Sequence, residues 1–233
     1  MVKKYKKENN TSYALGATLT VELIKRRPES VRAVYVSPRS DISAVPEAAR
    51  ENGIPIIESD KAINVLSPKG NCFAIGEFEK FSAPISPDRH HAVLVNPSDS
   101  GNLGTVMRAA AAFDFDLAIV RPCADPFDPK TIRASMGAAF CISFECFDSF
   151  EQYAARFGGR TVLPFMLGGA PFESYAFECG KKYSLVFGNE ATGLPESFSR
   201  YGSVRIAQSD DVDSLNLSVA AAIAMHGLYA SER

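Results

Sequence analysis

Three short stretches between residues 96 and 221 each place glycine and small polar residues directly after an apolar run typical of a β-strand. The stretches are 96–108, 185–195 and 204–221. An α/β sheet forms its ligand site at the carboxyl ends of its strands, where glycine lets the backbone come close to a ligand. This pattern, found in three places, predicts an α/β domain whose functional site gathers these stretches at one edge of the sheet.

Strand-like and helix-like segments alternate through this part of the chain. We expect strands at residues 91–95, 117–120, 141–144, 161–166, 183–187 and 203–206. We expect helices at residues 103–113, 129–136, 148–157 and 215–228, the third of them opened by a capping box from Asp148 to Glu151. Such alternation indicates a parallel sheet with helices on both faces.

A smaller α/β unit is predicted before this domain. The pattern indicates helices at 17–27, 45–52 and 60–66, the last capped by Asp60, and strands at 31–36, 54–57 and 72–76. Two prolines and little periodicity mark residues 81–90 as a linker. The expected order is therefore a basic tail at 1–10, an N-terminal RNA-binding or substrate-binding domain at 11–80, the linker, and a second domain at 91–233.

Composition excludes several classes of protein. The chain has 233 residues, 46% of them hydrophobic, with no signal peptide and no apolar run long enough to cross a bilayer. We therefore expect a soluble, cytoplasmic protein with no membrane partner. Five cysteines, an odd number without a Cys-x-x-Cys pair, argue against a disulfide framework or a zinc site.

The charge balance is close to neutral. A net charge of −2 weighs mildly against a nucleic-acid binder, although an average over the chain can hide a local basic patch. Two basic runs are candidates for such a patch: Lys3, Lys4, Lys6 and Lys7 near the N-terminus, and Lys25, Arg26 and Arg27 farther on. The first run also has the composition of a solvated, disordered tail.

The three stretches together resemble the motifs of the SpoU/TrmH-type RNA 2′-O-ribose methyltransferases, which belong to the knotted SPOUT class. The resemblance covers residues 91–230, and the N-terminal unit more weakly resembles the ribosomal-protein-like domain that precedes the catalytic domain in many of these enzymes. The matching motifs are Gly101-Asn102-Leu103-Gly104 with Arg108, Gly188-Asn189-Glu190 with Gly193, and Ser214-Leu215-Asn216.

The resemblance implies a parallel-sheet SPOUT domain whose last helix passes through a loop of the 160–190 region, which makes a C-terminal trefoil knot. It implies that the enzyme uses S-adenosyl-L-methionine to methylate a ribose 2′-hydroxyl in structured RNA, ribosomal RNA ahead of transfer RNA. It also implies a homodimer, and a methyl transfer that needs no metal. Two alternatives stay open: a non-catalytic RNA-binding or ribosome-assembly protein with this fold, and a SPOUT enzyme that methylates a base.

The resemblance also assigns roles to particular residues. The catalytic set is Arg108, Asn102, Glu190, Ser214 and Asn216. The cofactor-binding set is Leu163, Phe165, Met166, Leu167, Phe187, Gly188, Asn189, Gly193, Ile206, Ala207, Gln208, Leu215 and Leu217. The RNA-binding set is Arg133, which lies in a further matching segment, together with the basic run Lys25, Arg26 and Arg27, which its charge alone suggests. The sequence departs from the family at Ala207-Gln208, where Pro-Met is usual, and this departure falls in the expected cofactor loop.

Elementary chemistry gives several of these residues a simpler role as well. Asn102, Ser214 and Asn216 stand at expected helix starts, where their side chains can cap free N–H groups. Glu190 is the one acid of its loop and can accept hydrogen bonds from turn N–H groups. Arg108 suits a phosphate, and because arginine stays protonated we expect it to stabilise a developing alkoxide rather than to act as a base.

Overall fold

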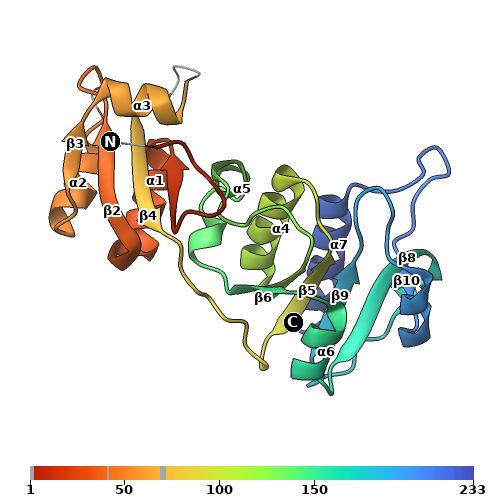
Figure 1. Cartoon of the computed structure of the whole chain (residues 1–233). Coiled ribbons are helices and arrows are strands. Elements are labelled where there is room, and N and C mark those ends of the chain that lie inside the picture. Colours follow the sequence, from red (N-terminus) through yellow and green to blue (C-terminus); the bar gives the residue numbers. More distant parts are fainter. Residues whose placement is uncertain (1–2, 41, 69–71) are drawn as a thin grey trace. The chain divides into compact units, whose positions relative to one another are not determined.

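The computed structural model describes residues 3–40, 42–68 and 72–233, so the first two residues of the expected tail lie outside it. Its contacts divide the chain into two compact units (Figure 1). The first unit comprises Met1–Phe81 and Asp125–Cys141, and the second comprises Ser82–Ala124 and Ile142–Arg233. The chain therefore crosses between the units at three points.

The first unit is built on a four-stranded mixed sheet with the order β1-β4-β2-β3. Its strands are β1 (Thr11–Leu15), β2 (Val31–Val36), β3 (Ile56–Glu58) and β4 (Ala74–Glu79). Strand β2 has the predicted bounds, because a run of β-branched residues favours a strand. The pattern did not predict β1, which is an edge strand paired antiparallel with β4.

Helices pack on this sheet through their apolar faces. They are α1 (Ala17–Arg26), α2 (Ala44–Glu51) and α3 (Asp60–Leu66), close to the predicted spans. One cluster buries Ile24, Val34 and Val45 between α1, α2 and the sheet. The cap of α3 is Ser59, whose side chain accepts from the Ala62 N–H, so the expectation of an Asp60 cap was wrong by one residue.

The segment Asp125–Cys141 groups with the first unit, although the sequence pattern suggested the second domain. It carries α5 (Pro129–Ala134) and a 3₁₀ turn, Ala138–Phe140. Aromatic contacts hold it: the rings of Phe78 and Phe140 meet edge-on at 5.4 Å, and those of Phe81 and Phe127 at 5.2 Å. These contacts join residues far apart in the sequence, so no local pattern could reveal them.

The second unit is built on a six-stranded sheet with the order β10-β8-β9-β5-β6-β7. Every neighbouring pair is parallel, which confirms the predicted parallel sheet. The strands are β5 (His90–Val95), β6 (Phe115–Val120), β7 (Phe144–Phe147), β8 (Thr161–Pro171), β9 (Tyr183–Phe187) and β10 (Val204–Arg205). The strand expected at 141–144 begins later, because the 3₁₀ turn extends to Phe140 and β7 starts only at Phe144.

Three α-helices complete the second unit: α4 (Ser100–Phe113), α6 (Phe150–Arg156) and α7 (Leu217–Ser231). Short 3₁₀ turns lie at Phe172–Ser174 and Glu196–Tyr201. The cap of α6 is Ser149, which accepts from the Gln152 N–H, while the Gln152 side chain accepts from the Asp148 N–H. The capping box therefore runs from Ser149 to Gln152, one residue later than expected. Helix α7 packs against both α4 and β9.

Residues of the expected linker are part of the second unit. Ile85 is buried, and Ala83 forms a β-bridge with Phe144. Arg160, just before β8, donates hydrogen bonds to the Pro87 carbonyl (2.8 Å), the Tyr183 carbonyl (2.9 Å) and the Ser184 hydroxyl (3.0 Å). The segment is thus clamped to the amino ends of the strands, the edge opposite to the one where the motifs meet. In the part of the chain that the structure describes, no helix is long and apolar enough to cross a membrane.

Candidate active site

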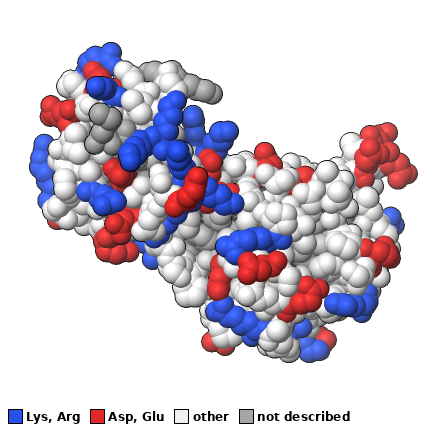
Figure 2. Space-filling model, viewed as in Figure 1, with Lys and Arg blue, Asp and Glu red and all other residues white. Residues whose placement is uncertain are grey.

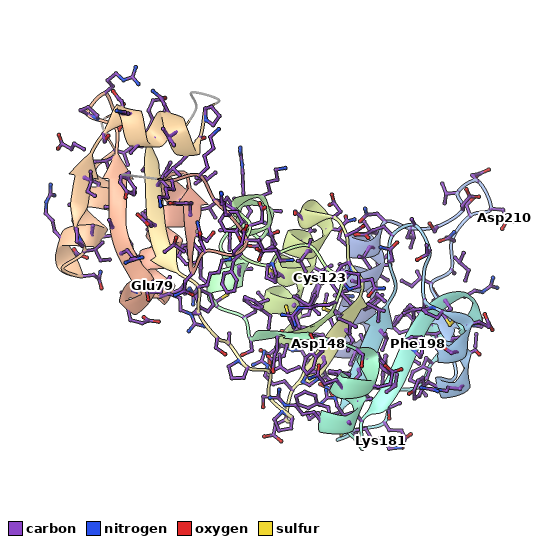
Figure 3. All side chains as sticks on the ribbon, viewed as in Figure 1. Glu79, Cys123, Asp148, Lys181, Phe198 and Asp210 are labelled. Carbon is purple, nitrogen blue, oxygen red and sulfur yellow. The ribbon has the colours of Figure 1, made fainter. Side chains whose placement is uncertain are left out.

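A cavity of about 530 Å³ opens in the second unit at the carboxyl ends of β8, β9 and β10. Its walls come from the end of β8, the loop after β9, the segment around β10 and the start of α7. These are the neighbouring strands of one parallel sheet, so their following loops share one edge. The loop that connects β10 to α7 projects away from the sheet and carries Asp210 near its tip (Figure 3).

Most of the residues expected to bind the cofactor line this cavity. They are Phe165, Met166, Leu167, Phe187, Gly188, Asn189, Gly193, Ile206, Gln208, Leu215 and Leu217. Leu163 and Ala207 do not line it. Leu163 is 3% exposed in the core, and the amide of Ala207 instead donates to the Glu173 carboxylate at 2.9 Å.

Sequence reasoning missed several lining residues. They are Gly168, Ala191, Thr192, Leu194, Glu196, Ser199, Ser203, Arg205 and Ala220, and Glu190 and Ser214 line the cavity as well. Ser203 and Arg205 reach the cavity because β8 extends to Pro171 and pairs there with β10. The predicted strand ended at residue 166. A prediction that extended it to Pro171 would have paired its end with β10 and so identified Ser203 and Arg205.

The loop after β9 requires glycine at two positions. Gly193 has φ 68°, and its N–H donates to the Asn189 carbonyl at 2.9 Å to close the loop. A Cβ at Gly188 would lie 2.1 Å from the Gly193 carbonyl carbon, so no other residue fits there without moving the backbone. This fold brings the backbone, rather than side chains, to the cavity wall.

Glu190 joins this loop to the start of α4. Its carboxylate accepts from the Ser98 N–H (3.1 Å), the Ser98 hydroxyl (2.8 Å), the Asp99 N–H (3.2 Å) and the Asn102 side-chain amide (3.2 Å). Partial burial alone would raise the pKa of Glu190, but the hydrogen bonds from Ser98 and Asn102 outweigh it and lower the pKa to about 2. The carboxylate is therefore ionised at neutral pH and serves as an acceptor, not as a general acid.

Asn102 and Asn216 continue this network to α7. The Asn216 side-chain amide donates to the Asn102 side-chain oxygen at 2.9 Å. The Asn216 oxygen also accepts from the Ser218 N–H at 2.8 Å and so caps α7. The cap of α4 is Asp99 rather than Asn102, which leaves the Asn102 side chain free to bridge Glu190 and Asn216. One hydrogen-bonded chain thus connects all three sequence motifs.

Arg108 lies apart from this network. It is exposed on α4 and does not line the cavity, whereas Leu103, Met107 and Ala110 of the same helix are buried. Gly101, Thr105 and Ala112 share its exposed face. Its guanidinium makes no hydrogen bond or ion pair within the described residues. The four other expected catalytic residues gather at the cavity edge or in the network, and Arg108 points elsewhere.

The expected RNA-binding cations lie in the first unit and differ in their availability. Lys25 and Arg26 are exposed but pair with Glu22 at 3.9 and 3.7 Å. Arg27 donates to the Phe140 carbonyl at 3.1 Å and lies 4.6 Å over the Phe81 ring, so it serves packing within the unit. Arg133 is exposed on α5.

The cavity suits an adenosyl cofactor in size and lining. Its volume falls in the range of small-molecule sites, about 300–1,000 Å³. Phe165 and Phe187 stack at 4.7 Å, and Leu215 and Leu217 add apolar surface. At Gly188 the backbone packs so closely against Gly193 and Leu194 that a Cβ would clash. Within the described residues, no three His, Cys, Asp or Glu side chains gather to hold a metal ion.

Comparison with known proteins agrees with this geometry. Over 153 residues, 65% of the chain, the sequence is 33% identical to the Ribosomal RNA small subunit methyltransferase G 2 of Syntrophobacter fumaroxidans, and it spans 30% of that protein's length. The AdoMet-bound rRNA methyltransferase from Sinorhizobium meliloti is similar with a TM-score of 0.79 and 27% identity over 93% of this chain and 85% of its own.

A third similar structure is described as one of the 2-OH methylation of C/U34 on tRNA. It has a TM-score of 0.58 and 31% identity, over 63% of this chain and 97% of that one. The model of the SpoU rRNA Methylase family matches residues 89–226, and methyltransferases of this family use S-adenosyl-L-methionine. That match covers more than half of the sequence and contains the cavity and the hydrogen-bonded motifs, so the chain belongs to the SpoU rRNA methylase family.

Proposed function

We propose that this protein transfers a methyl group from S-adenosyl-L-methionine to a ribose 2′-hydroxyl of RNA. The observation that carries the proposal is the chain of hydrogen bonds from Glu190 through Asn102 to Asn216, which ties the three motifs together beside the cavity. A similar structure concerned with 2-OH methylation of tRNA supports the ribose hydroxyl as acceptor. The family description and the Sinorhizobium meliloti protein favour ribosomal RNA as the substrate.

The cavity residues would bind the cofactor through backbone and apolar contacts. The loop after β9, the segment around Ile206 and the start of α7 with Leu215 and Leu217 would enclose it. S-adenosyl-L-methionine, when bound, supplies an electrophilic methyl group. The protein's own task is to orient the hydroxyl and to stabilise its charge as the proton leaves. Ser214 lines the cavity and is the hydroxyl side chain that we assign to the ribose.

Arg108 would enter the site of a second copy of the chain. It lies on an exposed face of α4, and α7, which packs on α4, exposes the apolar residues Val219 and Ile223. A homodimer through α4 and α7 would cover this apolar surface and bring Arg108 toward the partner's cavity. There the charged guanidinium would hold an RNA phosphate and stabilise the developing alkoxide.

Mixed dimers test this arrangement. The Arg108→Ala subunit has an intact cavity, and the Gly188→Ala subunit has an intact arginine. If Arg108 acts across the interface, an equal mixture of the two inactive variants regains about a quarter of the wild-type sites after subunit exchange. Complementation that stays at background, with heterodimers demonstrated by native mass spectrometry, would contradict the shared site.

We also infer that α7 passes through the loop between β8 and β9, which would make the trefoil knot of the SPOUT class. In support, β10 pairs with β8 at the sheet edge, and the chain then returns through the 206–216 loop to pack α7 on α4 and β9. The first unit would hold the RNA substrate. A cytoplasmic location, where ribosomal and transfer RNA are found, remains a prediction.

Nucleoside mass spectrometry tests the proposed reaction. Ribosomal and transfer RNA would be incubated with the protein and S-adenosyl-L-methionine, digested and compared with untreated RNA. The expected product is a 2′-O-methyl nucleoside from ribosomal RNA. A methylated base would favour the base methyltransferase, and RNA binding without any new methyl group would favour the non-catalytic assembly protein.

A further inference from the structure

The N-terminal segment, residues 3–10, is held against the first unit instead of extending freely into solvent. The Tyr13 hydroxyl donates to the Lys3 carbonyl at 2.8 Å, and the Lys80 ammonium donates to the Lys7 carbonyl at 2.7 Å. The Asn9 N–H closes a turn with the Lys6 carbonyl at 3.1 Å. The backbone is therefore fixed at both ends of the lysine run 3–7, which we call the lysine strap.

Tyr5 is the anchor in the middle of the strap. Its hydroxyl donates to the Asp125 carboxylate, and the Lys80 ammonium lies 4.9 Å from the centre of its ring. Lys80 and Asp125 approach each other to 3.7 Å, with side chains only 15% and 12% exposed. Burial and then the hydrogen bond to Asp125 raise the pKa of Tyr5, so it remains a protonated donor. Its ring also packs against the buried cluster that contains Ile75.

The lysine side chains of the strap are exposed to solvent, whereas its backbone is hydrogen-bonded to the first unit. Lys3, Lys4, Lys6 and Lys7 are all exposed, and their ammonium groups make no ion pair or hydrogen bond within the described residues. Lys25 and Arg26 differ because Glu22 partners both. In Figure 2, blue side chains gather over the N-terminal segment and α5, in a chain whose net charge is −2.

Helix α5 adds to this surface within the same unit. Lys130 and Arg133 are exposed on it, and Tyr5 bonds to Asp125 shortly before it. Met136, just after α5, is 52% exposed and has φ 51°, a conformation that non-glycine residues rarely adopt. An apolar side chain is thus exposed three residues after the cation Arg133. Phosphates attract cations, and an exposed apolar side chain can contact an unstacked base, so the combination fits RNA better than a simple anion.

We propose that the lysine strap and α5 form the surface with which the first unit grips the sugar–phosphate backbone of the RNA, and that Tyr5 is the residue that positions the strap. This inference rests on the proposed function. Holding several like charges together in the free protein is unfavourable, and a polyanion relieves that repulsion. A strap that is already ordered loses less conformational freedom on binding than a free tail.

Charge removal tests the surface. A variant with Lys3, Lys4, Lys6 and Lys7 all changed to Gln would be compared with Lys25→Gln/Arg26→Gln, using a fluorescein-labelled ribosomal RNA hairpin and fluorescence anisotropy over a range of salt. Each lost phosphate contact should reduce the slope of log K against log salt by about 0.7–0.9. We expect a clear reduction for the strap variant and a smaller one for the α1 control.

Tyr5→Ala tests the positioning role, because it leaves every charge in place. We expect roughly tenfold weaker RNA binding with S-adenosyl-L-methionine binding unchanged, since the long side chains must then be ordered on binding. Tyr5→Phe, which keeps the ring and loses the bond to Asp125, should fall between Tyr5→Ala and the wild type. If Tyr5→Ala binds RNA with wild-type affinity and salt slope, Tyr5 does not position the strap. If the variant with four lysines changed to Gln does so, the strap is not part of the RNA-binding surface. A wild-type protein that binds no RNA would overturn the proposed function together with this inference.

Discussion

Replacing Glu190 by Gln should loosen the site and destabilise the second unit. The carboxylate accepts hydrogen bonds from Ser98, Asp99 and Asn102. Gln keeps one acceptor oxygen and turns the other position into a donor, which would face the N–H groups that the carboxylate now accepts from. The variant therefore keeps the size of the side chain and loses the charge and about half of its accepting capacity.

The lowered pKa of Glu190 sets an upper limit on the loss of unfolding free energy in this variant. A fall in the pKa of Glu190 from 4.5 to about 2 corresponds to at most about 3.5 kcal/mol, since a tenfold change in proton affinity is worth about 1.4 kcal/mol. Glu190 is partly exposed, and water can replace some of its donors, so we expect about 1–2 kcal/mol. For a chain of this size that lowers the melting temperature by about 2–8 °C.

The dependence on pH has a definite sign. The folded-state pKa is depressed, so the stabilisation by Glu190 is fully present above about pH 4.5 and is lost as the pH falls toward 2. The difference in unfolding free energy between wild type and Glu190→Gln should be constant near pH 7 and shrink through that acidic window. Urea unfolding at several pH values measures it, with Glu151→Gln on the exposed start of α6 as control. A Glu190→Gln protein as stable as wild type at pH 7, with a parallel acid curve, would refute the bridging role.

Three other substitutions have distinct expected outcomes. Gly188→Ala should abolish S-adenosyl-L-methionine binding in calorimetry, because its Cβ would overlap backbone at 2.1 Å, whereas Gly168→Ala on the same cavity wall meets nothing within 4 Å and should bind normally. Arg108→Ala should lower the single-turnover methylation rate by about 10²–10³ with unchanged melting temperature, and a loss under about threefold would remove it from the mechanism. Arg160→Met should cost about 2–4 kcal/mol in chemical unfolding, because it strips the donors from the Pro87 and Tyr183 carbonyls; a change within error would mean that water replaces them.

The sequence predicted the parts of the fold that depend on local pattern. The spans of β2 and β9 were correct because each is a run of apolar or β-branched residues bounded by polar ones. Strand β1 was missed, since it is a short edge strand that begins with Thr and Ser and depends on pairing with β4. The position of Asp125–Cys141 depends on aromatic contacts with distant residues and was equally inaccessible.

For the site, the motifs predicted the loops better than the directions of side chains. Glycine spacing identified the loop at Gly188, because only glycine tolerates that approach. The exposure of Arg108, away from the cavity, follows from which face of α4 is buried, and the motif spacing does not contain that information. Its assignment to the catalytic set stays a prediction, as do the other site assignments.

The division of the first unit into two separate pieces of chain has a consequence for how the protein is made. During synthesis, residues 1–81 emerge first, yet the side chains that cover Phe78 belong to a segment that follows β6. The early part must therefore wait, with an aromatic face uncovered, until β5, β6 and the segment Asp125–Cys141 have left the ribosome. A fragment ending near residue 81 should be prone to aggregation, and co-expression with the remainder should rescue it. Folding of the first unit thus depends on synthesis of part of the second. An engineer who wishes to exchange the first unit must move residues 1–81 and 125–141 together.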